Sequence, residues 1–253
     1  MKKTLFRTIL LIILLAALAA SAYCIWYIVQ YYGGRGFKDD LREIGMKDSA
    51  PIDVEQETIE IPVDFAALQE MNPDIYAWID IPDTGISYAV LRREGDNNYY
   101  MNHAENGSYY SGGCIFSDDF NSPAMTDPVT VVYGHNLRNG TMFAALNDFA
   151  DSGVFSNHRY IYLYRPDRAL VYEIFSAAPH SNESLLKAHD FTKHSEFTAF
   201  FEEIASAGNG AQRREDCFPL AGDRVLVLST CWRVNNQNRF LVMGKLIADI
   251  PAA

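Results

Sequence analysis

The sequence Val225-Leu226-Val227-Leu228-Ser229-Thr230-Cys231, followed after a polar loop by Arg239-Phe240-Leu241-Val242-Met243, decides the fold of this chain. Each apolar run predicts a buried strand. The loop 233–238 is short enough for a hairpin, which would place Cys231 beside Arg239. A cation fixed beside a thiol favours the nucleophilic thiolate, and the same guanidinium can hydrogen-bond an oxyanion next to the sulfur. The alternative is a half-buried core cysteine and a surface arginine.

A histidine in a matching position supports a reactive site. Residues 129–133, Val-Thr-Val-Val-Tyr, predict another strand, which runs into Gly134-His135-Asn136. Gly134 permits a close approach of the backbone. Cysteine nucleophiles need a base or cation brought from elsewhere in the sequence, and a thiol, an imidazole and a guanidinium at strand ends fit one rim of a β structure. The alternative for His135 is a turn histidine bonded to the backbone.

Several short motifs are weak alone but specific in their joint order and spacing. The chain contains Tyr133-Gly134-His135-Asn136, Gly140-Thr141-Met142-Phe143, Leu228-Ser229-Thr230-Cys231 and Arg239-Phe240. With these motifs the chain resembles the sortase family, most closely its class B, over residues 64–248. Further matching segments are Trp78-Ile79-Asp80-Ile81-Pro82, Ile86-Ser87-Tyr88, Asn97-Asn98-Tyr99-Tyr100 and Gly112-Gly113-Cys114-Ile115-Phe116.

Short strand-like runs separated by turns dominate the chain after residue 76 and predict a barrel or a sandwich. They lie at 77–81, 86–91, 113–116, 129–133, 160–164, 170–177, 225–230 and 239–247. The resemblance implies a mainly β fold, the eight-stranded sortase barrel. Helices are predicted at 64–71, with Asp64 as the N-cap, at 142–150 and at 195–207. The last of these occupies the place where class B sortases carry an extra helix before the cysteine strand.

The N-terminal segment predicts a single transmembrane helix. Residues 9–29 contain no charged side chain and are long enough to span a bilayer. Lys2, Lys3 and Arg7 precede them, so the N-terminus would stay in the cytoplasm and the rest would lie outside the cell. The alternative is a signal peptide cleaved near the small residues 20–22. We therefore predict a cytoplasmic end and anchor at 1–32, a juxtamembrane helix and linker at 33–63 after a break at the glycine-rich segment 33–36, and a catalytic domain at 64–253.

Composition excludes some function classes. The formal net charge of −11 argues against a nucleic-acid partner. No glycine-rich phosphate loop or dinucleotide fingerprint occurs, so no cofactor is predicted. Asp118, Asp119 and Asp127 are more typical of a solvated loop than of a cation site, so no metal is predicted. Cys114 and Cys217 are left open as either a disulfide or two buried thiols.

The resemblance implies a membrane-anchored cysteine transpeptidase that cleaves a C-terminal sorting motif, of the Asn-Pro-x-Thr-Asn or Asn-Pro-x-Thr-Gly kind, on secreted proteins. Cys231 would attack the threonine carbonyl, Arg239 would stabilise the oxyanion, and His135 would protonate the departing amine. The thioester would remain until an amine of a peptidoglycan precursor resolves it, or until water does so when no amine is present.

Five further residues are predicted to contribute to the substrate site. Ser229 and Thr230 are candidates for backbone and hydroxyl contacts to the sorting motif. Asn97 or Asn98 would orient groups near the site. Trp232 would either wall the substrate groove or cap the barrel.

One departure and two alternatives complete the sequence-based interpretation. Some class B enzymes carry acidic residues directly after the cysteine, where this chain has Trp232 and Arg233, so a third, acidic catalytic member from this loop is not expected. One alternative function is a pilin-polymerising sortase that uses a lysine side chain of another protein. The other is a non-catalytic surface-binding barrel.

Overall fold

The computed structural model of the protein describes residues 2–46, 51–206, 208 and 210–253. Residues 47–50 of the predicted linker and residue 207 of the predicted helix 195–207 lie outside this part. The helices are α1 (Lys2–Gly45), α2 (Phe65–Met71), η1 (Tyr99–Met101), η2 (Ala144–Ala150), α3 (Ser152–Asn157), α4 (Leu185–Ala188) and α5 (His194–Ala205). The strands are β1 (Ile75–Ile81), β2 (Ile86–Leu91), β3 (Ile115–Ser117), β4 (Val129–Tyr133), β5 (Tyr160–Arg165), β6 (Arg168–His180), β7 (Gln212–Arg213), β8 (Val225–Cys231) and β9 (Arg239–Pro251).

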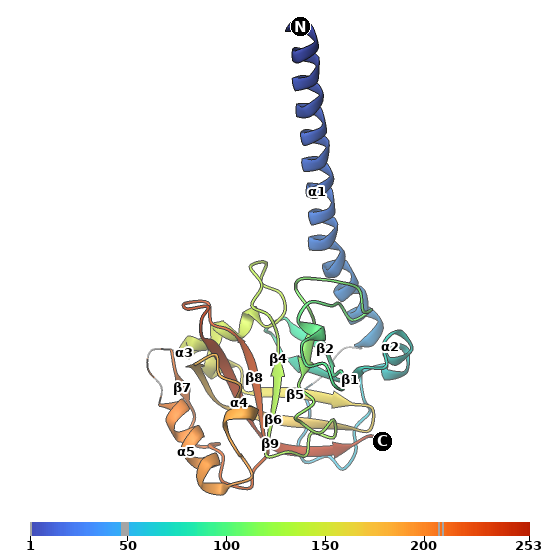
Figure 1. Ribbon diagram of the computed structural model, residues 1–253. Coiled ribbons are helices and arrows are strands. Elements are labelled where there is room, and N and C mark those ends of the chain that lie inside the picture. The colour runs from blue at the N-terminus through green and yellow to red at the C-terminus, as the bar shows by residue number, and fades with distance from the viewer. Residues whose placement is uncertain (1, 47–50, 207, 209) are drawn as a thin grey trace.

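Eight strands close into a barrel, which confirms the predicted fold (Figure 1). The order is β5-β1-β2-β3-β4-β8-β9-β6, and the pairing of β6 with β5 joins the two ends. The short β7 pairs with β6 beyond the stretch that β5 covers. Neighbours are antiparallel except β2–β3 and β4–β8, which are parallel. Because β4 and β8 run in the same direction, their C-terminal ends lie at the same rim of the barrel.

The apolar patterns located most strands because most strands are buried. The predicted bounds of β2 and β4 agree with the structure. β6 and β9 are longer than predicted, at 13 residues each, and pair from Arg168 with Pro251 to His180 with Arg239. The part of β9 beyond residue 246 alternates between exposed and covered side chains, and such a half-exposed strand carries a weaker apolar signal than a buried one.

The helix α5 lies between β6 and β8 in the chain, where the extra helix was predicted (Figure 1). Its apolar face buries Phe197, Phe200, Phe201 and Ile204. These side chains join a cluster with Phe175 of β6 and residues of β4 and β8. The helix therefore covers the outside of the barrel next to the two strands that carry the predicted reactive residues.

The segment after the predicted catalytic histidine forms two short helical elements. The helix predicted at 142–150 is the 3₁₀-helix η2, and it is followed by α3, which the sequence patterns did not indicate. Asp151 caps α3 by accepting hydrogen bonds from the backbone of Gly153 and Val154. Phe149 and Phe155 anchor these elements in the barrel core.

The predicted helix break at residues 33–36 is wrong, because α1 (Lys2–Gly45) runs through this segment without interruption. Glycine inside a helix costs only about 1 kcal/mol relative to alanine. The end of α1 gains packing in return: Leu41 is 3% exposed, and the backbone of Gly45 lies against Leu68 and Trp78. Within α1, Phe6–Val29 is long and apolar enough to cross a membrane, with a mean hydropathy of 2.5. The boundaries 1–32, 33–63 and 64–253 remain predictions.

Candidate active site

The strands β8 and β9 form the predicted hairpin, and its last pair brings a thiol to a guanidinium. Cys231 pairs with Arg239. The amide of Trp232 donates to the carbonyl of Asn238 at 3.0 Å, so Cys231 and Arg239 are a pair without mutual backbone hydrogen bonds, the kind in which side chains lie closest. Accordingly, Nη1 of Arg239 lies 3.6 Å from Sγ of Cys231.

The guanidinium of Arg239 is held at its other side by Asn182. Nε of Arg239 donates to Oδ1 of Asn182 at 2.6 Å. Asn182 follows β6 and precedes α4, so it reaches the hairpin from a different part of the chain. While Asn182 holds Nε, the terminal nitrogen Nη1 of the guanidinium lies next to the thiol. This contact could not be predicted from the sequence, because nothing in the local pattern distinguishes Asn182 from other loop asparagines.

The predicted histidine lies at the same rim as the thiol. The parallel pairing of β4 with β8 ends at Tyr133 and Ser229, and the amide of Gly134 then donates to the carbonyl of Ser229 at 3.1 Å. A Cβ at Gly134 would lie 2.4 Å from the side chain of Ile115 and 2.7 Å from the ring of Phe143, so glycine is needed here for close packing of the backbone against these side chains. His135 follows directly and enters the rim.

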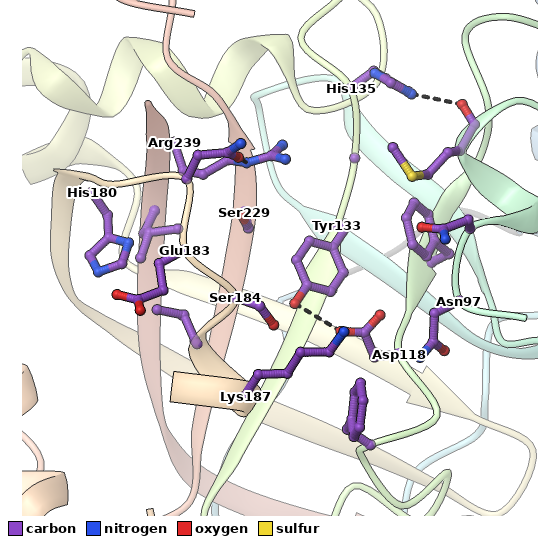
Figure 2. A pocket seen from close by; sticks show the side chains of 18 residues that line it. Asn97, Asp118, Tyr133, His135, His180, Glu183, Ser184, Lys187, Ser229 and Arg239 are labelled. Atoms are coloured by element: carbon purple, nitrogen blue, oxygen red, sulfur yellow. Dashed lines mark hydrogen bonds between the residues drawn. The ribbon is translucent and has the colours of Figure 1, made fainter. Parts of the chain in front are cut away.

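In this structure the imidazole of His135 is turned toward the carbonyl of Met101, the last residue of η1 (Figure 2). Its Nε2 lies 2.8 Å from the carbonyl oxygen of Met101. Because a carbonyl only accepts, Nε2 must carry a proton. A neutral His135 then has Nδ1 available as the acceptor for a second proton.

A groove of about 300 Å³ lies beside these residues (Figure 2). Arg239, Ser229 and His135 line one part of it. Asn97, Asn98 and the residues of the segment that connects β6 to α4 line another part. The groove therefore offers an extended ligand access to the end of the β8–β9 hairpin. Cys231 is not among the lining residues, but its strand partner Arg239 and Ser229, two residues before it on β8, both are.

Comparison with known proteins identifies the family. The family model described as the sortase domain matches residues 79–247. The chain belongs to the sortase family. This sortase is 27% identical to Sortase B of Listeria monocytogenes over 212 residues, 83% of each chain. It is similar to the crystal structure of sortase B from B. anthracis in complex with AAEK1, with a TM-score of 0.71, 28% identity, and coverage of 87% of this chain and 99% of that chain.

A second solved structure points to the same class. The Staphylococcus aureus sortase B–substrate complex matches with a TM-score of 0.64 and 26% identity over 73% of this chain and 84% of that chain. This sortase is therefore most like class B. The family makes it a cysteine transpeptidase whose substrates are proteins with sorting signals.

Alternation along β8 separates the two hydroxyl residues that were predicted to contact the sorting motif. Ser229 lines the groove. Thr230 is 0% exposed, on the opposite face of the strand, and pairs with the buried Phe240. Its Oγ1 has no hydrogen-bond partner among the described residues. The structure thus brings Ser229 to the groove and places the Thr230 hydroxyl out of reach of a substrate in it.

Trp232 packs against the end of the barrel core. Its ring stacks on Phe240 with centroids 6.5 Å apart, and it contacts the main core cluster. It does not line the groove. Trp232 was expected either to wall the substrate groove or to cap the barrel, and in the structure it caps the barrel.

Asn97 and Asn98 both line the groove but differ in their hydrogen bonds. Nδ2 of Asn97 donates to Asp119 at 2.6 Å, and Oδ1 of Asn97 accepts from the backbone of Asp119 at 2.7 Å. The bond from Asn97 lowers the pKa of the Asp119 carboxyl. Both polar atoms of the Asn97 side chain are therefore bonded to Asp119 in the wall of the groove. The side chain of Asn98 makes no capping bond to η1, whose N-cap it is.

Asp118 gives the groove a polar end. Its carboxylate accepts a hydrogen bond from the hydroxyl of Tyr133 at 3.0 Å (Figure 2). Burial raises the pKa of Asp118, and the nearby Lys187 partly opposes this shift. Burial together with the charge of Asp118 raises the pKa of Tyr133. In the described part of the chain, no group of three His, Cys, Asp or Glu side chains is arranged to hold a metal ion.

The two remaining domain cysteines are separate buried thiols. Neither forms a disulfide. The thiol of Cys114 donates to the carbonyl of His103 at 3.1 Å. Burial raises the pKa of the Cys217 thiol to about 11. Cys231, in contrast, is partly exposed at the rim.

Proposed function

We propose that this sortase cleaves Asn-Pro-x-Thr-Asn-like or Asn-Pro-x-Thr-Gly-like sorting motifs at the threonine carbonyl and transfers the acyl group to an amine of a cell-wall precursor. The observation that carries the proposal is the 3.6 Å separation of Sγ of Cys231 from Nη1 of Arg239, beside a groove that His135 also lines. A thiol with a fixed cation and a nearby base is the arrangement that acyl transfer through a thioester needs.

The first half-reaction forms the thioester. The thiolate of Cys231 attacks the carbonyl carbon of the threonine, and the electron pair of the C=O bond moves to oxygen. Arg239 donates hydrogen bonds to this oxyanion, which forms next to the sulfur. When the C–N bond breaks, His135 gives a proton to the departing amine.

The second half-reaction releases the product. An incoming amine attacks the thioester, and His135, now neutral, accepts its proton. The tetrahedral intermediate then expels the Cys231 thiolate, which regenerates the enzyme. When no amine is present, water takes its place and the reaction becomes hydrolysis. The open groove beside Ser229 gives space for the second substrate to approach the same carbon.

The proposed setting is the outer face of a cell membrane. The helix segment Phe6–Val29 would span the bilayer with the N-terminus in the cytoplasm, because Lys2, Lys3 and Arg7 lie before it. The catalytic domain 64–253 would then meet secreted proteins and the peptidoglycan precursor. The apolar composition of Phe6–Val29 supports this setting, and so does the fact that no part of this segment of α1 is buried inside the protein.

The test is mass spectrometry of the full-length protein in detergent, incubated with pentapeptides of both motifs, with and without an added amine. We expect an acyl-enzyme on Cys231 and, when triglycine is present, a peptide–triglycine product. Cys231→Ala should abolish both because alanine has no thiol, and the protein should still fold because the substitution leaves only a small void. The matched control Cys217→Ala should retain both products.

Other outcomes would contradict the proposal. Cleavage by Cys231→Ala at a tenth of the wild-type rate would rule out Cys231 as the nucleophile. Transfer to a lysine side chain of a pilin-like peptide but not to triglycine would favour the pilin-polymerising alternative. Binding of peptides without any acyl-enzyme would favour a non-catalytic barrel.

A further inference from the structure

The carbonyl oxygen of Cys231 is held by side chains at the point where a strand ladder ends. Along the parallel pair of β4 and β8, the amide of Gly134 donates to the carbonyl of Ser229. Two residues further along both segments, Nδ2 of Asn136 donates to the carbonyl of Cys231 at 3.0 Å. By this point the chain after β4 has turned away and forms a bridge between Asn136 and Met142. A carboxamide thus replaces the backbone donor that a longer strand would supply.

A second carboxamide reaches the same oxygen from η2. Nδ2 of Asn147 donates to the carbonyl of Cys231 at 3.2 Å, and Oδ1 of Asn147 accepts from the amide of Arg233 at 2.7 Å. Asn147 is 7% exposed, so water has little access to compete for either of its two hydrogen bonds. One side chain therefore holds the peptide groups on both sides of Trp232, directly after the thiol.

We propose that Asn136 and Asn147 are positioning residues that fix Cys231 relative to Arg239 and His135. The proposal rests on the assignment of Cys231 as the nucleophile. Strand ends fray when their backbone groups lack partners, and a displacement of about 1 Å at a reacting atom can cost a hundredfold in rate. The two carboxamides, named here the amide clamp, remove that freedom at the residue that reacts.

The amide clamp also links the nucleophile to the base. Asn136 follows His135 directly in the chain, so its bond to Cys231 connects the two predicted catalytic residues through one peptide unit and one hydrogen bond. Asn147 connects the same carbonyl to η2. A shift of the loop that carries His135 is therefore transmitted to Cys231, and the spacing of base and thiol is set by the clamp as well as by the barrel.

The test compares Asn136→Ala, Asn147→Asp and the double variant of the full-length protein. Asn147→Asp keeps the acceptor for the Arg233 amide but loses the donor to Cys231. Each single variant should slow acylation of Cys231 roughly three- to tenfold, with KM unchanged, because one donor still satisfies the carbonyl. The double variant leaves the carbonyl without either donor, so its loss should exceed the product of the two single losses.

Two measurements separate positioning from general loosening. Alkylation of Cys231 by a small methanethiosulfonate needs no alignment with Arg239 or His135, so its rate should stay within about threefold of the wild type. The melting temperature of each variant shows whether it folds. If Asn147→Asp does not fold, Asn147→Ser, whose shorter side chain reaches neither the carbonyl of Cys231 nor the amide of Arg233, tests the loss of both contacts together.

The matched control is Asn235→Ala. Asn235 lies in the β8–β9 loop, is exposed, and accepts from the amide of Gln237 at 3.1 Å without touching Cys231. It should acylate at the wild-type rate. Strictly multiplicative losses in the double variant, a rise in KM with unchanged kcat, or an equal loss in Asn235→Ala would each overturn the proposal. Loss of acylation in Cys231→Ala together with unchanged rates in the clamp variants would overturn the clamp alone and leave the proposed function intact.

Discussion

Replacement of Arg239 by lysine separates two roles that the guanidinium could have. In the structure, Nε of Arg239 is bonded to Asn182 at 2.6 Å while Nη1 lies 3.6 Å from the sulfur of Cys231. A lysine keeps the positive charge but has one nitrogen at the end of a flexible chain. It can occupy the place of one of these two contacts, not both, so the donor aimed at the oxyanion loses its fixed direction.

The expected loss is large if Arg239 is an oxyanion donor. Removal of one such donor typically costs about 2.7–4 kcal/mol in the activation free energy, or roughly a hundred- to thousandfold in rate. If Arg239 acts only through its charge on the thiol, lysine should restore most of the activity, because a Coulomb interaction depends on distance and not on the shape of the donor. The two roles therefore differ by about two orders of magnitude in the same variant.

The assay is the single-turnover rate of acyl-enzyme formation in Arg239→Lys, measured beside the rate of Cys231 alkylation by a small reagent. A hundredfold slower acylation with nearly unchanged alkylation is expected. Arg138→Lys, at an exposed arginine of the loop after His135, serves as the matched control and should react normally. Acylation by Arg239→Lys within fivefold of the wild type would refute the oxyanion role.

Three further predictions concern stability and accessibility. Thr230→Val should raise the free energy of unfolding in urea by about 1 kcal/mol, because a methyl replaces a buried hydroxyl without a partner; a tenfold loss of acylation would instead restore Thr230 as a substrate contact. At pH 7.5, peptide mapping should show that methanethiosulfonate modifies Cys231 at least about tenfold faster than Cys217, whose pKa is raised to about 11; equal rates would contradict the burial of Cys217. Deletion of residues 1–32 should leave the melting temperature of the domain unchanged, whereas deletion of 1–45 should destabilise it by about 2 kcal/mol, because the burial of Leu41 is lost; equal melting temperatures would contradict the docking of α1.

The reactive hairpin could be predicted from the sequence because its determinants are local. Continuous apolar runs mark β8 and the start of β9, and the short, mostly polar segment 232–238 between them leaves little choice of connection. The same holds for β4 and the histidine after it. The barrel itself came from the resemblance, since apolar runs do not show which strands pair.

The contacts that support the site were not predictable in the same way. Asn182, Asn136 and Asn147 reach Arg239 and Cys231 across 57, 95 and 84 residues of chain, respectively, and a single asparagine in a loop carries no signal of its distant partner. The burial of Thr230 was within reach, since strict alternation from Cys231 places it on the opposite face of the strand. The continuation of α1 was not, because its end depends on packing against Leu68 and Trp78 rather than on local propensity.

The uninterrupted course of α1 has a consequence for where the enzyme can work. From Val29 to Gly45 the helix rises about 24 Å at 1.5 Å per residue, and its last turn is packed onto the domain. In Figure 1 the C-terminal end of β4 points toward the side from which α1 enters. With Phe6–Val29 in a bilayer, α1 would be a rigid spacer of fixed length rather than a flexible linker. The rim of the barrel that bears Cys231 would then face the lipid surface. In that arrangement the distance between the rim and the lipid surface would be set by the length of α1, and the enzyme would act within a thin layer next to the membrane.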